Sequence, residues 1–404
     1  MQQFDAMKRI RNLIAILYVL VSVLGCHAAS QTSVKVGAER VESYLPMLKG
    51  KRVALLSNHT GIVPDGRHTL DVLMDNGVDV RLIFSPEHGF RGTADAGEHV
   101  SGSVDRKTGV PIESLYGSAS KRVPSAEAMS KIDVVVCDMQ DVGLRFYTYY
   151  ITMLDVMNAA AAAGKQFVVL DRPNPNGMYV DGPVLDMRLA SGVGRLPIPV
   201  VHGMTLGELA RMIVGEKWLK GGAGLDLMVV PCDGYTHAFR YSLPVAPSPN
   251  LPDMKAVYLY PSTCLFEGTV MSLGRGTEMP FCVYGHPDMK GCTFEFTPQS
   301  RPGAKNPPLR GRRCHGRDLR SIPDDTIIAR GLDLEYVIDA MRHVELKGKD
   351  KKFFTSFFDK LIGNTSVRRM LEQGKSAADI KATWQSDVAE FRRLRRPYLL
   401  YPEG

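Results

Sequence analysis

Short apolar runs alternate with helix-like segments through the first half of the chain. Runs of strand length occupy residues 52–56, 80–84, 132–137, 167–170 and 227–230. Between them, residues 150–163 place Met153, Met157 and Ala160 on one side of a helix that stops at Gly164. Apolar strands that alternate with helices are typical of a parallel sheet covered on both faces. We therefore predict an α/β fold for this part of the chain.

Polar residues cluster directly after four of these strands. The clusters are Ser57-Asn58-His59-Thr60-Gly61, Ser85-Pro86-Glu87-His88-Gly89, Asp138-Met139-Gln140-Asp141-Val142-Gly143 and Asp171-Arg172-Pro173-Asn174-Pro175-Asn176-Gly177. In open α/β sheets, ligands bind outside the carboxyl ends of the strands. We therefore expect one site built from the four clusters, with the long connection at residues 90–117 folded over it.

The pattern changes after residue 235. Residues 242–261 are rich in proline, and residues 298–308 form a polar segment of proline and glycine. The last hundred residues are helical in pattern, with an apolar stripe at Ile380, Trp384, Val388 and Phe391. We predict a catalytic domain at residues 34–285 and a smaller domain at residues 286–404 that completes the cleft.

The N-terminus has the pattern of an export signal. Three basic residues precede the apolar run at residues 13–24, and small residues follow at 28–30. The run is shorter than the roughly 18 residues that a membrane span requires. We predict a signal peptide at residues 1–25 and a periplasmic or membrane-anchored protein of a bacterium. The sequence Val23-Leu24-Gly25-Cys26 is similar to a lipoprotein box, so lipidation of Cys26 is the membrane contact we expect.

Composition and charge exclude several classes of function. The chain is 44% hydrophobic and 23% charged, which is typical of globular proteins and excludes wholesale disorder. The net charge of +7 is concentrated in residues 300–404, which carry 22 basic against 14 acidic residues. No basic motif is rich in aromatic residues, so we expect no nucleic-acid partner. The phosphate-binding loop, the G-x-S-x-G elbow and the H-E-x-x-H motif are absent, and we expect no cofactor.

Glu87 is the strongest candidate for a catalytic group. It follows Pro86, which restricts the backbone, at the end of a buried strand. A partly desolvated carboxyl has a raised pKa, which suits a general acid. Asp138 and Asp141 are candidates for a second carboxylate, and each is also a candidate cap for the helix that follows.

Other residues of the clusters are candidates for binding. Arg145, Arg172 and Arg275 stand in loops, where an arginine either clamps a substrate carboxylate or forms a structural ion pair. Asp171 is expected to orient Arg172 or a loop amide. Tyr147 is suited to stack on a sugar or to form a hydrogen bond with it, or it is simply part of the first turn of the helix. The histidines His59, His88 and His202 with Asp138 are possible metal donors by type, but their spacing fits no ligand motif, so we expect no metal.

Six ordered motifs resemble the bacterial exo-β-N-acetylmuramidase (NamZ-type) family. They are residues 56–61, 84–92, 138–149, 171–175, 268–277 and 398–401. The resemblance implies a Rossmann-like parallel sheet domain followed by a smaller C-terminal α+β domain, with an exo-acting glycosidase site in a cleft. It implies peptidoglycan fragments with a non-reducing N-acetylmuramic acid as substrate, and it places the family's acidic residue on Glu87.

We hypothesise that Glu87 protonates the glycosidic oxygen while Asp141 or the substrate's acetamido group assists at the anomeric carbon. Asn58, His59, His88, Arg145, Tyr147, Asp171, Arg172, Asn174 and Arg275 form the expected substrate-binding set, with muropeptides such as MurNAc-GlcNAc as partners. Two alternatives fit the same cleft: a metal-dependent hydrolase and a non-catalytic muropeptide-binding envelope lipoprotein. No oligomeric state is predicted.

Overall fold

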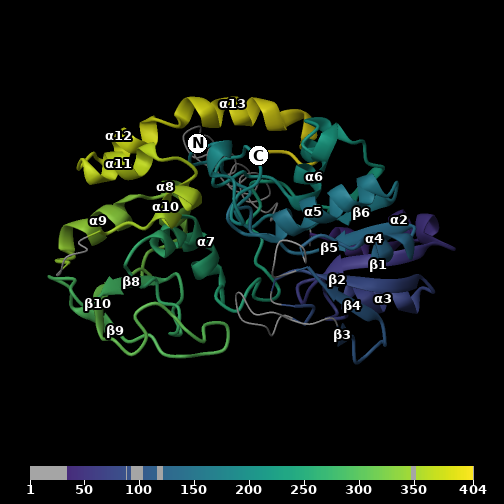
Figure 1. Ribbon diagram of the computed structural model, residues 1–404, viewed down its shortest axis with the longest axis horizontal. Helices are drawn as coiled ribbons and strands as arrows, with labels where there is room; N and C mark the ends of the chain where they lie inside the picture. Colours follow the sequence, from purple (N-terminus) through teal and green to yellow (C-terminus); the bar gives the residue numbers. More distant parts are fainter. Residues whose placement is uncertain (1–33, 88, 92–102, 116–121, 347–351, 404) are drawn as a thin grey trace, which may run out of the picture. The chain divides into compact units, whose positions relative to one another are not determined.

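A parallel sheet forms the first half of the chain, as the computed structural model shows (Figure 1). The structure describes residues 34–87, 89–91, 103–115, 122–346 and 352–403. The expected signal peptide, Cys26 and His88 therefore lie outside the described residues. The strands are β1 (Arg52–Ser57), β2 (Asp79–Ser85), β3 (Ser103–Val104), β4 (Pro111–Ser114), β5 (Val134–Asp138), β6 (Gln166–Leu170) and β7 (Leu227–Val230).

The strand order is β3-β4-β2-β1-β5-β6-β7. Six strands run parallel, and the short edge strand β3 pairs antiparallel with β4. The predicted strands lie within two residues of the observed ones. Inside the connection at residues 90–117, β3 and β4 extend the edge of the sheet, which the sequence did not predict. Residues 92–102 and 116–117 lie outside the described residues, so the expectation that this connection folds over the site stays a prediction.

Helices cover both faces of this sheet, as the alternation of apolar strands and helices predicts. The helices of this part are α2 (Val41–Leu48), α3 (Thr69–Asp75), α4 (Ala126–Ser130), α5 (Tyr149–Ala162) and α6 (Leu206–Gly215). Side chains of α2 and α3 pack with Val134 and Val136 of β5 on one face. Side chains of α4, α5 and α6 pack with Val135 and Cys137 on the other face. Consecutive residues of a strand point to opposite faces, and both faces are covered, so all five β5 side chains are buried.

The second half contains a small antiparallel sheet and a group of helices. The sheet has the order β8-β10-β9, with β8 (Val283–His286), β9 (Phe294–Phe296) and β10 (Cys314–Asp318). The helices are α7 (Met254–Thr263), α8 (Asp324–Arg330), α9 (Glu335–His343), α10 (Ser356–Ile362), α11 (Ser366–Glu372), α12 (Ala377–Ala382) and α13 (Gln385–Arg395). None of the helices in the described ranges is both long and apolar enough to cross a membrane. This arrangement confirms the predicted α/β sheet followed by a smaller α+β part.

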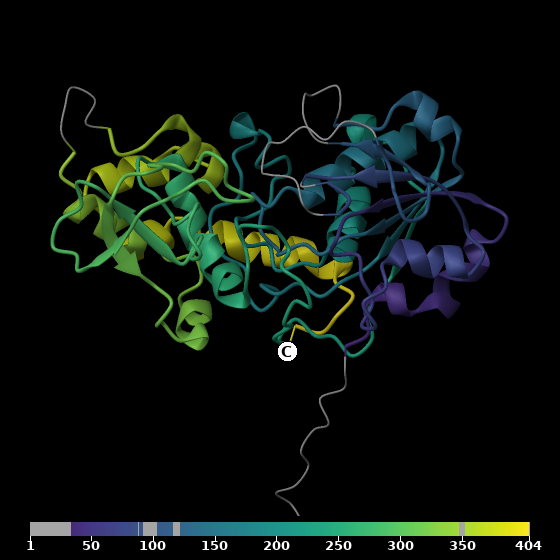
Figure 2. The same cartoon turned by 90° about the horizontal axis from the view of Figure 1, so that it is seen from below.

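The apolar core is shared between the two halves. Trp384, Val388 and Phe391, the predicted stripe of the C-terminal helices, are buried in the same cluster as Met153 of α5. Figures 1 and 2 show the yellow helix α13 passing from the α11–α12 group back toward α6. Residues from Lys35 onward form one compact unit. The predicted boundary between residues 285 and 286 falls inside β8, and the division into two domains stays a prediction.

Candidate active site

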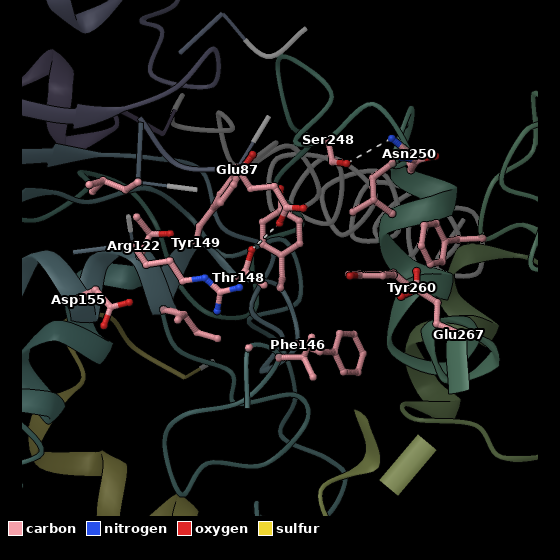
Figure 3. A pocket seen from close by; sticks show the side chains of 18 of the residues that line it. Glu87, Arg122, Phe146, Thr148, Tyr149, Asp155, Ser248, Asn250, Tyr260 and Glu267 are labelled. Atoms are coloured by element: carbon pink, nitrogen blue, oxygen red, sulfur yellow. Dashed lines mark hydrogen bonds between the residues drawn. The ribbon is translucent and has the colours of Figure 1, made fainter. Parts of the chain in front are cut away.

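A cavity of about 430 Å³ lies where loops after the parallel strands meet the segment that follows α7 (Figure 3). Its described polar lining includes Glu87, Arg122, Thr148, Asp155, Asn250, Glu267 and Arg275. Its aromatic lining includes Phe146, Tyr147, Tyr149, Tyr260 and Phe281. A cavity with carboxylates among aromatic rings is suited to a ligand that has both hydroxyl groups and apolar faces.

Glu87 lies on the cavity wall that the parallel sheet supplies. It stands two residues after the end of β2, and its Oε2 accepts a hydrogen bond of 2.9 Å from the Thr148 hydroxyl. Thr148 directly precedes α5, so the contact joins the loop after β2 to the start of this helix. The carboxyl group is half-buried and faces the cavity. The sequence prediction that Glu87 lies in the site is therefore consistent with its position.

A second carboxylate, Glu267, lies across the cavity from Glu87 (Figure 3). It belongs to a 3-10 helix, Cys264–Gly268, that continues α7. Arg275 donates Nε and a terminal nitrogen to Glu267 Oε1 at 3.0 and 2.6 Å, and its guanidinium lies over the Phe281 ring. Arg275 thus lines the cavity as expected, but it forms the ion pair that was the alternative to a substrate clamp. Sequence reasoning missed Glu267, although it directly precedes the motif that begins at Gly268.

Tyr147 lines the cavity together with Tyr149, which follows it by two residues. The two hydroxyl groups donate to the Pro247 carbonyl at 2.7 and 3.2 Å, and the two rings meet edge to face. The hydroxyl groups are held by this carbonyl. The aromatic surface is therefore what Tyr147 offers to a ligand, as the sequence suggested.

Arg172 and Asp138 form a buried ion pair behind the cavity. Arg172 Nε and a terminal nitrogen donate to the two Asp138 oxygens at 2.5 and 2.9 Å, and the same terminal nitrogen reaches the Ile62 carbonyl. Both side chains are almost fully buried. Neither lines the cavity, so Arg172 is placed to hold strand-end loops together rather than to bind a ligand carboxylate.

Asp171 and its neighbours are likewise engaged in internal contacts. Asp171 accepts hydrogen bonds from the Thr205 and Tyr401 hydroxyl groups, each at 2.6 Å, and from the Gly207 amide at 2.8 Å. Burial raises its pKa to about 6. These bonds attach the start of α6 and the end of the chain to β6. Of the two partners expected for Asp171, Arg172 or a backbone amide, the structure shows an amide, that of Gly207.

Asn58, His59 and Asn174 also lie outside the described lining of the cavity. The Asn58 side chain accepts from the amide and hydroxyl of Thr60, and Asn174 donates to the Met204 carbonyl. A ring nitrogen of His59 lies 2.9 Å from the Ala246 carbonyl. These contacts lie within or between neighbouring loops, so the three residues have internal partners in this structure.

Arg145 is fully buried, although the sequence placed it among the substrate-binding residues. Its terminal nitrogens donate to the carbonyl groups of Pro183, Ile198 and Leu361 at 2.7, 2.9 and 2.9 Å. These carbonyls belong to segments distant along the chain. The guanidinium therefore joins the two halves of the protein and does not reach the cavity.

Asp141 lies behind the tyrosine wall and does not line the cavity. Its Oδ1 accepts from the Gly143 amide at 2.7 Å, and its Oδ2 is buried without a hydrogen-bond partner among the described residues. Burial raises the pKa of Asp141 to about 7. The carboxyl group therefore does not line the cavity, whereas Glu267 and Asp155 do.

Asp141 should make stability depend on pH. Because the pKa of Asp141 is raised in the folded state, the folded chain binds a proton that the unfolded chain releases near pH 4. Stability should then fall as pH rises from about 4 to about 7. Asp141→Asn should remove this loss and be more stable than the parent at pH 8 by on the order of 2–4 kcal/mol, with little difference at pH 4.

Urea unfolding at pH 4, 6 and 8 measures this difference. Asp79→Asn, a change at an exposed carboxylate of β2, is the matched control and should leave the pH dependence of the parent. A difference between Asp141→Asn and the parent that does not vary with pH would contradict the assignment of a raised pKa to Asp141.

The histidines considered as metal donors by type are His59, His88 and His202, of which the structure describes His59 and His202. Within the part of the chain that the structure describes, no group of three histidine, cysteine, aspartate or glutamate residues is arranged to hold a metal ion. His202 is buried and accepts from the Met204 amide, and burial lowers its pKa to about 3. Asp138 is held by Arg172, and His88 lies outside the described residues.

An acidic side chain at a cavity of aromatic rings, on the carboxyl edge of an α/β sheet, is the arrangement of a glycosidase. Two family models, exo-beta-N-acetylmuramidase NamZ N-terminal and C-terminal, match residues 53–255 and 258–401. The chain is 38% identical over 393 residues to the peptidoglycan beta-N-acetylmuramidase NamZ of Bacillus subtilis strain 168, covering 92% of each protein. The chain belongs to the NamZ exo-β-N-acetylmuramidase family.

Two solved structures share this fold. A DUF1343 family protein of Bacteroides fragilis has a TM-score of 0.86 at 53% identity, covering 92% of this chain and all of its own. A second DUF1343 family protein of that organism has a TM-score of 0.73 at 28% identity, with 91% and 99% coverage. The likeness extends over both halves, so the sheet and the small C-terminal part belong to one shared architecture.

Proposed function

We propose that this chain is an exo-acting glycosidase that releases N-acetylmuramic acid from the non-reducing ends of peptidoglycan fragments, in cell-wall turnover and recycling. The observation that carries the proposal is Glu87, a half-buried carboxyl held by Thr148 at the edge of the cavity. Membership of the NamZ family and the Bacillus subtilis relative support the reaction and the peptidoglycan substrate.

The proposed mechanism uses carboxyl groups from the two opposite walls of the cavity. Glycoside cleavage needs an acid at the leaving oxygen and stabilisation of an oxocarbenium-like anomeric carbon. Glu87 supplies the proton to the leaving oxygen. At the anomeric carbon, the substrate's acetamido group or Glu267 assists, in place of Asp141, which is buried behind Tyr147 and Tyr149. The aromatic rings bind the apolar face of the sugar.

The site of action is part of the proposal. The basic and apolar pattern of residues 1–25 supports export, and Cys26 supports attachment of a lipid. Both lie before the compact unit that begins at Lys35. An enzyme held in the periplasm or at a membrane by this route would meet peptidoglycan fragments directly.

Cleavage of a defined disaccharide tests the proposed reaction. The chain from residue 27, which contains the whole compact unit, is incubated with MurNAc-β-1,4-GlcNAc, and the products are analysed by mass spectrometry. We expect release of free MurNAc. The matched control is the isomer GlcNAc-β-1,4-MurNAc, which has no non-reducing muramic acid and should stay intact.

The alternatives give different results in the same experiment. A muropeptide-binding lipoprotein would bind MurNAc-GlcNAc in calorimetry and leave it intact. A metal-dependent hydrolase would lose activity in EDTA and regain it with a divalent ion. Cleavage of both disaccharides would contradict exo-action at muramic acid.

A further inference from the structure

Positive charge is gathered on an exposed surface at the end of α13. Residues 391–398 contain four arginines and no acidic residue. Arg395 is buried, whereas Arg392, Arg393 and Arg396 are exposed. None of these three forms an ion pair within the part of the chain that the structure describes. Because residues three and four apart share one side of a helix, the three side chains leave α13 on a common side.

The acidic residues around these arginines are engaged elsewhere or precede them along the helix. Glu403 forms an ion pair with the buried arginine of the same segment. Glu216, directly after α6, accepts a hydrogen bond of 2.7 Å from the Tyr398 hydroxyl. Asp387 and Glu390 belong to earlier turns of α13. The exposed arginines therefore direct their charge into solvent, where an anionic surface can approach them.

The end of α6 adds to this surface. Arg211 of α6 donates to the Tyr398 carbonyl at 2.8 Å, and Figure 1 shows the yellow helix α13 ending beside α6. Lys217, two residues after α6, is exposed, and Trp218 and Tyr398 are half-buried. Rings with an apolar body and a polar edge are enriched where proteins meet the headgroup layer of a membrane. We call Arg392, Arg393, Arg396, Lys217 and Tyr398 the α13 surface.

The compact unit begins near the residues that follow the α13 surface. Lys35 exchanges backbone hydrogen bonds of 2.9 and 2.8 Å with Asp233. The amide of the preceding residue, Cys232, donates to the Tyr401 hydroxyl at 2.9 Å, and Tyr401 lies three residues after Tyr398. The start of the compact unit, the last residues of the chain and the α13 surface therefore lie in one region of the protein.

The length of chain before Lys35 limits the distance of this region from a lipid on Cys26. Eight residues separate Cys26 from Lys35, and a fully extended chain of that length spans about 30 Å. A lipid on Cys26 would therefore keep this region near the headgroups of a bilayer. We propose that the α13 surface binds the anionic headgroups of a phospholipid bilayer, an inference that rests on the proposed lipid attachment for its location.

Charge complementarity favours this partner. Each lysine or arginine next to an anionic bilayer strengthens binding about five-fold, an effect that salt weakens. A guanidinium also binds a phosphate through two parallel N–H···O bonds. None of the residues of the α13 surface lines the cavity. Binding of a bilayer and cleavage of a soluble disaccharide therefore use different residues and are measured separately.

Sedimentation with vesicles tests this inference. The chain from residue 27, which carries no lipid, is mixed with vesicles of phosphatidylglycerol and phosphatidylethanolamine or with neutral vesicles of phosphatidylcholine. We expect binding to the anionic vesicles that weakens as salt rises. Arg396→Gln should lower the partition coefficient about five-fold, and R392Q/R393Q/R396Q should reduce it to the value for neutral vesicles. R392K/R393K/R396K, which keeps the charges, should stay within about two-fold of the parent.

A matched variant separates the α13 surface from net charge. R67Q/R81Q/R320Q removes the same charge at exposed arginines that are each paired with an aspartate, and it should bind like the parent. An unchanged thermal unfolding midpoint shows that each variant is folded.

Three results would overturn the inference. They are a parent without preference for anionic vesicles, equal losses in the two triple glutamine variants, and binding to isolated peptidoglycan without binding to vesicles, which would assign the surface to a wall polymer. A parent that binds anionic vesicles through the α13 surface but does not cleave MurNAc-GlcNAc would support this inference and overturn the proposed reaction.

Discussion

Glu87→Gln is expected to lower kcat for release of MurNAc from MurNAc-GlcNAc by about 10³-fold. Glutamine has nearly the same shape and keeps an oxygen that accepts from Thr148, but it cannot deliver a proton to the leaving oxygen. The fold should be unaffected, because Glu87 is half-buried and its described side-chain bond is preserved. The measurement is the initial rate of MurNAc release together with the thermal unfolding midpoint.

A substrate with a second leaving group shows whether the lower kcat of Glu87→Gln reflects the loss of proton delivery. The 4-nitrophenolate ion departs without protonation, so Glu87→Gln should lose about 10-fold or less on 4-nitrophenyl β-N-acetylmuramide. Glu113→Gln is the matched control, since Glu113 lies on β4 and does not line the cavity. Equal losses on both leaving groups would contradict a general acid, and near-normal turnover by the folded variant would remove Glu87 from the mechanism.

The position of Glu87 could be predicted from the sequence because it depends only on the residues next to it along the chain. A short apolar run predicts a strand, and the residues directly after it must lie at the carboxyl end of that strand. The same logic located Asp138 and Asp171 at the ends of β5 and β6. The local sequence pattern therefore predicted both the sheet and the edge of the sheet at which the cavity lies.

The local sequence pattern does not show which of these polar side chains face the cavity. The partners of Arg145 are carbonyls 38, 53 and 216 residues away, and Asp171 is bound by Tyr401 from 230 residues away. Contacts of this range are set by how the two halves pack. A loop arginine that holds the fold together and one that binds a substrate therefore look the same in the sequence.

Glu267 on the opposite wall was missed for a related reason. It lies on a 3-10 helix after α7, outside the strand-end clusters. Its position has no periodicity that separates it from ordinary surface charge. Only the packing of the C-terminal part against the sheet brings Glu267 to the cavity that contains Glu87.

Arg145→Met should destabilise the protein by about 3–5 kcal/mol, which would separate a structural from a substrate-binding role. Methionine fills much of the volume, but the buried carbonyls of Pro183, Ile198 and Leu361 lose the N–H groups of Arg145, and Ile198 keeps the Leu185 amide as a donor. The site is closely packed, since a Cβ at Gly363 would lie within contact of the guanidinium. Burial also lowers the pKa of Arg145 to about 10, which marks a cation separated from solvent.

Urea unfolding of the parent and Arg145→Met gives the free energy of unfolding, and kinetics at low temperature give KM for the folded fraction. A structural Arg145 predicts a lower unfolding free energy with KM within about two-fold of the parent. Arg81→Gln, an exposed arginine change, should alter neither quantity. Unchanged stability with a KM raised about ten-fold would instead place Arg145 at the substrate, and the cavity would then have to extend behind Tyr147.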